Sequence, residues 1–572
     1  MRDEELRGRV EAWLADEVDD AAAAELRVLL DAAEGGAAER GAAERGAAER
    51  GAAERGAAER GAAERGAAER GADSQAAEAE LVDRFRGPLT FGTAGLRGPV
   101  RAGPNGMNRV VVRRAAAGLA AWLTAQGRSG EPVVVGYDGR HGSAEFAHDS
   151  AAIFAAAGFD ARLLPRLLPT PVLAFAVQHL GAAAGVMVTA SHNPPQDNGY
   201  KVYVADGAQI APPVDVEIEA AIRAVASARG VPLSDRYTVL GEDIVDAYVG
   251  AVAGLIGPGS REVRIVHTAM HGVGTEVITK VFAAAGFAPM HGVPQQAAPD
   301  ADFPTVSFPN PEETGALDLA LALAREQDAD LVIANDPDAD RCAVAVPDAS
   351  GEWRMLRGDQ VGVLLADALL RKGVRGTYAT TIVSSSMLGA MAARNQVPYR
   401  ETLTGFKWIS RAAPDLVFGY EEALGYAVAP ELVRDKDGIS AALLVAELAA
   451  ALKADGSSLT QRLEQLYAEY GRYATDQVSV RVEDLALIAA MMQRLRARPP
   501  TQLLGRPVTV EDLLPDNDVL RLRWQGGRVV IRPSGTEPKL KAYLEVIVPD
   551  GDAAHAAELL AHLRGEVGAA LA

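Results

Sequence analysis

Ser191 is a candidate nucleophile, and it lies in the proline-rich stretch TASHNPP at 189–195. An apolar run at 185–189 predicts a buried strand that leads into this stretch. The two prolines oppose a helix and fix a loop at the carboxyl end of that strand, where open α/β sheets place their ligands. A nucleophilic serine needs a nearby base or a phosphoryl group that it already carries, and His192 is adjacent while Lys201 follows ten residues later. A lone turn of this composition more often caps a strand, so Ser191 indicates chemistry only together with other motifs.

Three aspartates, Asp336, Asp338 and Asp340, alternate along DPDADR at 336–341, again directly after an apolar run. Alternating residues of an extended loop project to one side, and a hard divalent cation relieves the repulsion among crowded carboxylates. Three oxygens leave room in an octahedral shell for water and a phosphate oxygen, which favours magnesium. An EF-hand loop is excluded, because Arg341 and Pro347 stand where it needs glycine and glutamate. A solvated acidic turn is the alternative.

Two later segments carry groups suited to a phosphorylated ligand. The segment GYEEALG at 419–425, with RDKDG close behind at 434–438, combines glycines that admit a ligand to the backbone with acceptors for sugar hydroxyls. Its alternative is the acidic first turn of a helix. The segment RPSGTEPK at 532–539 offers an arginine fork, two hydroxyls and a glycine amide, which suit a phosphate. Its alternative is a basic turn between strands.

Further cations follow glycine-bearing loops. Arg97 lies in FGTAGLRG at 91–98 and Lys407 in TGFK at 404–407, while Arg140 lies in DGR, after a predicted strand at 132–136. Taken singly, each of these predicts a surface charge more often than a catalyst.

Composition narrows the class of protein. A chain of 572 residues predicts about three to five domains. The single cysteine, Cys342, excludes an intramolecular disulfide, and the charged start MRDEE lacks the apolar core of a signal peptide. No apolar run is long enough for a bilayer, so we expect a cytoplasmic protein without a membrane partner. The formal net charge of −20 argues against nucleic-acid binding, and it requires that cations concentrate locally if the ligand is an anion.

The first 80 residues differ from the rest of the chain. Apolar positions from Glu5 to Leu30 predict a helix, and the unit GAAER then recurs from Gly36 to Arg70. A five-residue period forms no apolar stripe on a helix, and each glycine costs about 1 kcal/mol relative to alanine. The repeat therefore predicts a frayed helix or a disordered linker, with a partner-binding arm as the alternative.

Alternating strands and helices begin at Leu81 and predict α/β units on largely parallel sheets. The pattern recurs three times, and predicted strands at 518–524, 528–533 and 541–548 with a helix at 552–571 indicate a smaller α+β domain at the end. The predicted boundaries are an N-terminal helix and repeat at 1–80, α/β domains at 81–235, 236–346 and 347–470, and an α+β domain at 471–572.

Taken in this order, the segments resemble the α-D-phosphohexomutase superfamily, which includes phosphoglucomutases and phosphomannomutases. The likeness runs from about Leu81 to the end of the chain, and FGTAGLRG with GYEEALGY is similar to the longer branch that contains phosphoglucomutases with phosphopentomutase activity. The resemblance implies four domains around a central cleft, the first three sharing an α/β fold. It implies nothing about the GAAER repeat.

The resemblance also implies roles for single residues. Ser191 would be the phosphoserine, and the three aspartates would bind Mg²⁺ together with the serine phosphate. Lys201, as a general acid or base, and Arg341 would lie near the transferring group. Contacts with the substrate would come from Glu421 to the sugar hydroxyls and from the loop that holds the non-reacting phosphate, namely Arg532, Ser534, Gly535 and Thr536. From their positions in the sequence, and not from the resemblance, we expect His192 and Arg97 to be catalytic and Lys407 to bind the substrate.

The implied activity is a phosphosugar mutase that interconverts sugar 1-phosphate and 6-phosphate, of glucose or mannose, through a phosphoserine and a sugar 1,6-bisphosphate. We expect a monomer or dimer. Ala423 stands where many hexose members carry serine, which leaves the sugar open. Phosphopentomutase, sugar-bisphosphate synthase and a non-catalytic sugar-phosphate-binding regulator are the alternatives.

Overall fold

The computed structural model describes residues 2–49, 73–92, 95–348, 350–482, 485–534 and 539–571. These residues form two compact units. The first contains residues 1–246, 270–273 and 298–313, and the second contains residues 247–269, 274–297 and 314–572.

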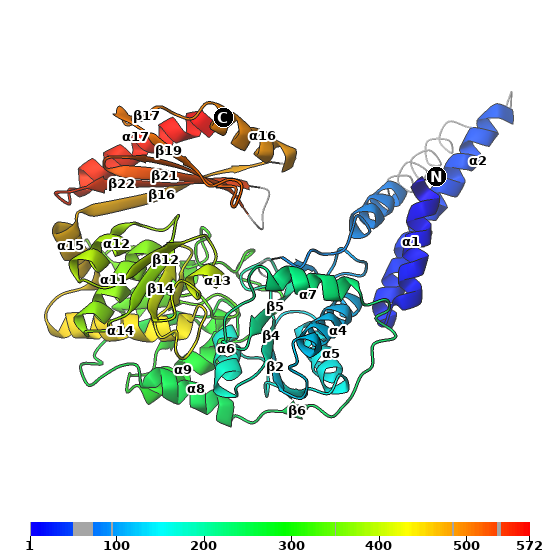
Figure 1. The fold of residues 1–572 in the computed structure, drawn as a ribbon, viewed down its shortest axis with the longest axis horizontal. Coiled ribbons are helices and arrows are strands. Elements are labelled where there is room, and N and C mark those ends of the chain that lie inside the picture. Colours follow the sequence, from blue (N-terminus) through cyan, green and yellow to red (C-terminus); the bar gives the residue numbers. More distant parts are fainter. Residues whose placement is uncertain are drawn as a thin grey trace. The chain divides into compact units, whose positions relative to one another are not determined.

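A six-stranded sheet forms the centre of the first unit, in the order β1-β5-β4-β2-β3-β6. The inner strands β4, β2 and β3 are parallel, whereas β5 is antiparallel to both β4 and β1. Helix α6 covers one face of the sheet, and α4 and α5 cover the other (Figure 1). The strands are β1 Leu96–Pro99, β2 Pro132–Tyr137, β3 Asp160–Leu163, β4 Ala184–Val188, β5 Asp197–Val204 and β6 Thr238–Val239. The helices are α4 Arg109–Ala125, α5 Ser143–Ala156, α6 Thr170–His179 and α7 Val214–Arg223.

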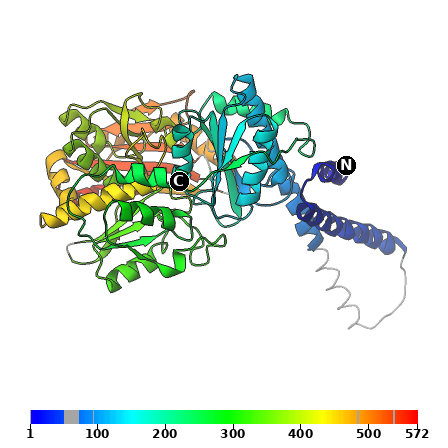
Figure 2. The same ribbon diagram turned by 90° about the horizontal axis from the view of Figure 1, so that it is seen from below.

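Helices α1 (Arg2–Asp16) and α2 (Asp20–Glu49) run side by side as a helical arm at one end of this sheet domain (Figures 1 and 2). A further helix spans 73–84. The prediction of one helix over 5–30 is wrong at 17–19, because the Asp19 carboxylate accepts hydrogen bonds from the amides of Ala21 and Ala22 and starts a new helix. The repeat is helical as far as Glu49, and its remainder at 50–70 lies outside the described residues.

The second unit opens with a five-stranded sheet in the order β11-β10-β9-β7-β8. Its parallel strands β7 and β9 are fully buried, as their apolar sequences predict. The strands are β7 Ile265–Thr268, β8 His291–Gly292, β9 Leu331–Ala334, β10 Ala343–Pro347 and β11 Trp353–Met355. The helical elements nearby are α8 Asp243–Ala253, which spans the boundary of the two units, α9 Gly274–Ala284, η1 Pro294–Gln296 and α10 Asp318–Glu326.

The next sheet has the order β13-β12-β14-β15 and is mixed, because β15 is antiparallel to β14. Helix α14 packs on this domain and also against α9 of the preceding one (Figure 2). The strands are β12 Thr377–Thr381, β13 Tyr399–Thr402, β14 Leu416–Glu421 and β15 Gly425–Ala427. The helices are α11 Gly358–Arg371, α12 Met387–Arg394, α13 Phe406–Ile409, α14 Gly438–Ala454 and α15 Leu459–Tyr470.

The C-terminal part is the expected α+β domain, an antiparallel sheet in the order β16-β22-β21-β20-β19 against which α17 packs. Partly buried ion pairs join it to the preceding domain: Glu401 accepts from Arg521 at 2.6 Å and from Arg528 at 2.5 Å. The strands are β16 Arg472–Arg481, β17 Gln502–Leu503, β18 Arg506–Pro507, β19 Thr509–Asp512, β20 Leu520–Trp524, β21 Gly527–Pro533 and β22 Lys539–Val548. The helices are α16 Leu485–Ala497 and α17 Ala553–Leu571.

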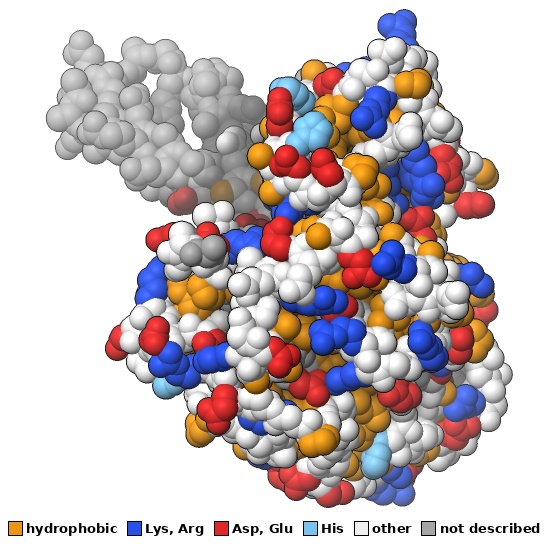
Figure 3. All heavy atoms as spheres, turned by 90° about the vertical axis from the view of Figure 1, so that its left-hand side faces the viewer, with side chains coloured by type: hydrophobic (Ala, Val, Ile, Leu, Met, Phe, Trp, Pro, Cys, Tyr) orange, Lys and Arg blue, Asp and Glu red, His pale blue; other side chains and the backbone are white. Residues whose placement is uncertain are grey.

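The surface carries charges of both signs, and Figure 3 shows basic and acidic side chains interspersed over the face that it presents. No helix among the described residues is both long and apolar enough to cross a membrane.

Candidate active site

Ser191 lies in the serine loop (residues 189–197), which connects the buried strands β4 and β5. Its backbone has a φ of +54°, in the left-handed region that costs a non-glycine residue about 1–3 kcal/mol. The Ser191 amide donates to Thr189 Oγ1 at 2.9 Å, and Ser191 Oγ lies 3.2 Å from His192 Nδ1. The structure therefore brings the expected nucleophile and its neighbouring imidazole into hydrogen-bond contact on a strained turn.

Arg97 and Lys201 lie beside the serine loop on the adjoining strands. Arg97 on β1 is opposite Gly199 on β5, so its side chain leaves the same face of the sheet as Lys201, two residues further along β5. Arg97 Nη1 donates to Asn193 Oδ1 at 3.4 Å, and Lys201 is 2% exposed. Two of the predicted cations are thus placed around the loop by strand register.

The interpretation of DGR at 138–140 as surface charge is wrong. Asp138 and Arg140 are 2% and 4% exposed, and Arg140 donates hydrogen bonds to carbonyl oxygens of the serine loop. Burial raises the pKa of Asp138, while the charge of Arg140 acts in the opposite direction. The sequence signal was the position of DGR immediately after a buried strand.

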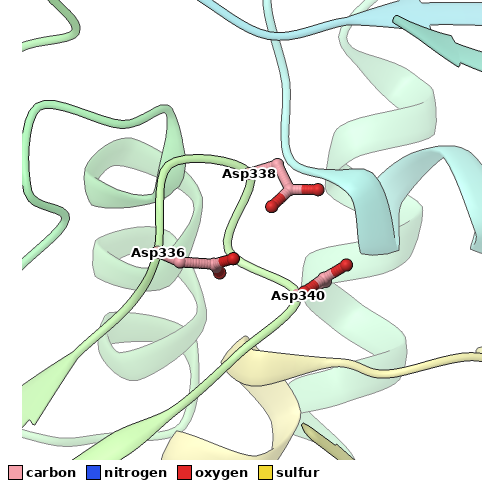
Figure 4. A group of neighbouring side chains, drawn as sticks. All are labelled: Asp336, Asp338 and Asp340. Carbon is pink, nitrogen blue, oxygen red and sulfur yellow. The ribbon is translucent and has the colours of Figure 1, made fainter. Parts of the chain in front are cut away.

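The aspartate loop (residues 335–341) connects β9 and β10. Asp336, Asp338 and Asp340 are fully buried, and one carboxylate oxygen from each lies within 4.8 Å of the other two (Figure 4). The predicted extended loop is instead a tight turn, in which the Ala339 amide donates to the Asp336 carbonyl at 2.9 Å and Ala339 has a φ of +54°. The turn, rather than strand-like alternation, gathers the carboxylates.

Neutral groups hold the backbone of the aspartate loop. Asn335 Nδ2 donates to the Arg341 carbonyl at 2.7 Å, and Asn335 Oδ1 lies 3.0 Å from His267 Nε2. Burial lowers the pKa of His267 to about 4, so its imidazole is neutral at pH 7. The Gly438 amide donates to the Ala339 carbonyl at 3.2 Å, and a Cβ at Gly438 would overlap the Arg341 carbonyl oxygen.

Two cations flank the three carboxylates. Arg341 Nε is 3.9 Å from Asp336 and 4.0 Å from Asp340, and Lys436 Nζ is 3.3 Å from Asp340. Burial lowers the pKa of Lys436, but Asp340 and Asp435 outweigh it and hold that pKa above its ordinary value. Three hard oxygen donors with two cations beside them suit a divalent ion such as Mg²⁺. Sequence reasoning missed Lys436, although RDKDG was a clear signal with its lysine between two aspartates.

Glu421 is the last residue of β14, and the charges of Lys436 and Arg341 act on its carboxyl group. Burial raises its pKa to about 7, while Lys436 and Arg341 act in the opposite direction. Arg341 pairs with Gly425 as an isolated β-bridge, so the aspartate loop and the GYEEALG turn adjoin within one unit. The alternative of an acidic helix start is wrong, because Glu421 closes a strand and leads into a hairpin with β15.

The remaining predicted residues lie elsewhere in the second unit. Lys407 is 6% exposed on the short helix α13, with its Nζ 5.1 Å from the centre of the Trp408 ring. Arg532 lies near the end of β21, and Ser534 directly follows that strand, where its amide donates to the Lys539 carbonyl at 2.8 Å. Within the described residues, no hydrogen bond or ion pair joins Arg532 or Ser534 to the aspartate loop. Gly535 and Thr536 lie outside the described residues.

Sequence models of four successive domains match the chain in order. They are the alpha/beta/alpha domains I, II and III of phosphoglucomutase/phosphomannomutase, at residues 88–229, 246–351 and 357–470, and the C-terminal domain of the same family at residues 478–563. The chain belongs to the phosphoglucomutase/phosphomannomutase family. It is therefore an α-D-phosphohexomutase superfamily member with the expected four-domain fold, and an intramolecular phosphotransferase.

Individual relatives agree with this membership. The chain is 49% identical over 453 residues to a protein named probable phosphomannomutase from Haemophilus influenzae, covering 77% of this chain and 93% of that protein. It is 36% identical over 534 residues to a phosphopentomutase of Mus musculus, covering 83% and 86%. Among solved structures, that of a candidate phosphomannomutase from Thermus thermophilus aligns with a TM-score of 0.69 and 28% identity, covering 84% of this chain and 98% of that one.

Proposed function

We propose that this mutase interconverts sugar 1-phosphate and sugar 6-phosphate, of glucose or mannose, by passing a phosphoryl group through Ser191. The observation that carries the proposal is the conformation of Ser191, which is buried at 2% exposure with a φ of +54° at the carboxyl end of a parallel strand. Strain of this kind persists where surrounding contacts fix a functional group in one geometry. Ser191 Oγ would carry the phosphoryl group and transfer it to the free sugar hydroxyl, leaving a sugar 1,6-bisphosphate. After the intermediate turns round, its other phosphate would return to Ser191.

The three buried aspartates are the proposed site for Mg²⁺, with the Ser191 phosphate as the remaining ligand group. In support, three carboxylates within 4.8 Å of one another are repulsive without a cation, and the nearby Arg341 and Lys436 offset their charge only partly. When bound, the ion would supply Lewis-acid neutralisation of the phosphate oxygens. The residues themselves contribute a pre-formed turn that keeps the three carboxylates together.

Lys201 is proposed to transfer protons, and Glu421 is proposed to contact the sugar hydroxyls. Lys201 projects from the face of the sheet that also carries Arg97, and we assign it as general acid or base, with His192 and Arg97 beside Ser191. Because the pKa of Glu421 is about 7, its carboxyl group can both accept and donate hydrogen bonds to sugar hydroxyls near neutral pH. Arg341 would add positive charge near the transferring group.

The non-reacting phosphate is assigned to the segment at 532–539, through Arg532, Ser534, Gly535 and Thr536, with Lys407 as a further cation. Arginine forks and glycine amides suit a phosphate dianion. With one phosphate site at Ser191 and a second at 532–539, either phosphate of the bisphosphate can occupy either site, as a mutase requires.

Phosphopentomutase is the second candidate function, favoured by the 36% identity to a protein of that name and by Ala423 in the turn after Glu421. An assay panel separates the two. Glucose, mannose, glucosamine, ribose and deoxyribose 1-phosphates are each presented with Mg²⁺ and a trace of the cognate bisphosphate. We expect the hexose 1-phosphates to give the highest kcat/KM, and a preference for a pentose phosphate would replace the first proposal with the second.

The same panel tests the remaining alternatives. Net accumulation of bisphosphate from an added phosphoryl donor would indicate a sugar-bisphosphate synthase. Binding of sugar phosphates without turnover of any of them would indicate a regulator and would contradict the mutase proposal.

A further inference from the structure

Arg140 occupies a position that the proposed reaction does not use. It stands directly after β2, and its guanidinium lies under the serine loop. Nη2 donates to the carbonyls of Ser191 at 2.7 Å and Asn193 at 2.5 Å, and Nη1 donates to those of Pro194 at 2.8 Å and Asp197 at 3.0 Å. One side chain thus binds four carbonyl oxygens spread over the loop.

Only an arginine has the geometry for these contacts. Its planar guanidinium presents five N–H groups in a rigid fork, whereas the three N–H groups of a lysine radiate from one nitrogen. Two of the four acceptors, Asn193 and Pro194, precede prolines, so each contributes a carbonyl to a peptide bond that carries no N–H. Arg140 supplies an external donor to both carbonyls, and the Pro194 carbonyl also accepts from the Asp197 amide at 3.1 Å.

Arg140 is itself held from two sides. Asp138 Oδ2 lies 3.6 Å from its Nε, and Asp138 Oδ1 in turn accepts from Ser143 Oγ at 2.7 Å. On the other side, the guanidinium lies over the ring of Phe303, 4.9 Å from its centre. Phe303 is buried and has a φ of +46°, which indicates that its surroundings fix it in place.

Phe303 belongs to the 298–313 segment, which falls within domain II by sequence but within the first unit by its contacts. The segment reaches the serine loop region at two further points. Asp302 Oδ1 lies 2.7 Å from His141 Nε2, and the Phe308 ring lies 6.2 Å from the His192 ring. A part of the metal-binding domain's sequence therefore supports the guanidinium beneath Ser191.

We propose that Arg140 is a positioning residue for phosphoryl transfer at Ser191, and that Phe303 of the 298–313 segment holds it in place. The inference rests on the proposed function, because it assigns Arg140 the task of keeping Ser191 Oγ in its reactive position. Four carbonyl contacts fix the strained backbone of the loop, so the nucleophile does not have to be ordered when substrate arrives.

The decisive variant is Arg140→Lys, which keeps the charge and loses the fork. We expect kcat to fall about 100-fold while KM changes by less than about threefold, because a small displacement of a reacting atom costs rate rather than binding. Arg113→Lys is the matched control. Arg113 is also buried in the first unit, where it pairs with Asp149 on α5 rather than with the serine loop. It should lose stability with a kcat close to the wild-type value.

Chemical rescue separates positioning from general damage. Arg140→Ala leaves a hole shaped for a guanidinium, so guanidinium ion at concentrations too low to unfold the protein should restore kcat, whereas an equal concentration of sodium chloride should not. Phe303→Leu should lower kcat in the same direction but by less. Equal kcat losses in Arg140→Lys and Arg113→Lys, or no rescue, would overturn the assignment.

Amide hydrogen exchange provides a readout that needs no turnover. In Arg140→Lys we expect faster exchange confined to the amides of residues 191–193 and 196–198, compared with wild type and with Arg113→Lys. Unchanged exchange in those amides would contradict the proposal that Arg140 orders the serine loop. If wild type turned over none of the sugar phosphates, the proposed function would fail, and the exchange result would still decide whether Arg140 orders the loop.

Discussion

The serine loop and the aspartate loop solve one structural problem in different ways. Each follows a buried parallel strand, and each contains a non-glycine residue with a φ of +54°, Ser191 in one and Ala339 in the other. The serine loop combines its own turn hydrogen bonds with a buried guanidinium that binds four of its carbonyls. The aspartate loop is held by several neutral contacts, from the Asn335 amide, the Gly438 amide and the turn's own hydrogen bond.

The difference follows from the charge that each loop must carry. A cation beneath the serine loop is compatible with a phosphate on Ser191, which would be an anion. The aspartate loop already holds three carboxylates, so a cation that bound its backbone would compete with a metal for them. Neutral groups hold the backbone of the aspartate loop, and the cations Arg341 and Lys436 lie near its carboxylates instead. The serine loop thus receives four of its backbone contacts from one charged side chain, whereas neutral groups hold the backbone of the aspartate loop.

In the proposed reaction, phosphoryl transfer depends on the single residue Ser191, whereas metal binding is shared among three aspartates. The variant Ser191→Ala should therefore have the largest effect. All phosphoryl transfer would pass through one oxygen, so we expect kcat to fall by about four orders of magnitude or more. Thermal unfolding should stay close to that of wild type, because the contacts of Arg140 are with the backbone of the loop and not with Ser191 Oγ. Mutase activity near the wild-type value in this variant would refute the phosphoserine assignment.

Asp338→Asn tests the aspartate loop, in which three carboxylates share the proposed binding of Mg²⁺. It removes one of three carboxylates and keeps the size of the side chain, so two ligands remain and some activity should survive at high Mg²⁺. We expect the Mg²⁺ concentration for half-maximal activity to rise at least about 100-fold, since even changes to groups that only orient a metal ligand cost about 10–100-fold. Asp328→Asn, an exposed aspartate of the same unit, is the control. Full activity of wild type after thorough chelation would rule out the metal site.

Much of the contrast between the two loops could be predicted from the sequence, and part of it could not. Apolar runs such as 331–334 predict the buried strands, so the positions of Ser191 and the three aspartates at strand ends follow from local pattern. The positive φ of Ser191 and Ala339 has no local signal, because neither residue favours it and tertiary contacts impose it. The burial of Arg140 depends on carbonyls more than 50 residues away, which no short motif reveals.

Gly438→Ala tests whether packing holds the aspartate loop. The new Cβ would overlap the carbonyl oxygens of Arg341 and Ala339, so the loop or the start of α14 must shift. We expect a loss of about 2–3 kcal/mol in the free energy of unfolding and weaker binding of Mg²⁺. Gly250→Ala, in helix α8 with open space around its Cα, should be neutral or slightly stabilising. Unchanged Mg²⁺ affinity in Gly438→Ala would show that the loop does not need this contact.

The smallest expected effect is a loss of stability at acidic pH that arises from His267. The pKa of His267 is about 4 in the folded protein, below the value of about 6.5 for an exposed imidazole, because burial disfavours the charged form. Since the unfolded chain binds the proton first, His267 costs no stability above pH 7 and progressively more as the pH falls from about 6.5 towards 4. Between pH 7 and pH 5 the loss should be about 2 kcal/mol, measured by urea unfolding.

His267→Gln isolates this contribution. The amide retains a donor for Asn335 Oδ1 and does not titrate, so the difference in unfolding free energy between wild type and variant should shrink by that amount over the same pH range. Arg140 keeps its charge throughout this range, so the amide protection factors of the serine loop, corrected for the pH dependence of intrinsic exchange, should change little, while those of the aspartate loop fall. If both loops loosened together, or if wild type and His267→Gln showed the same pH dependence, the contrast between a charged and a neutral scaffold would be wrong.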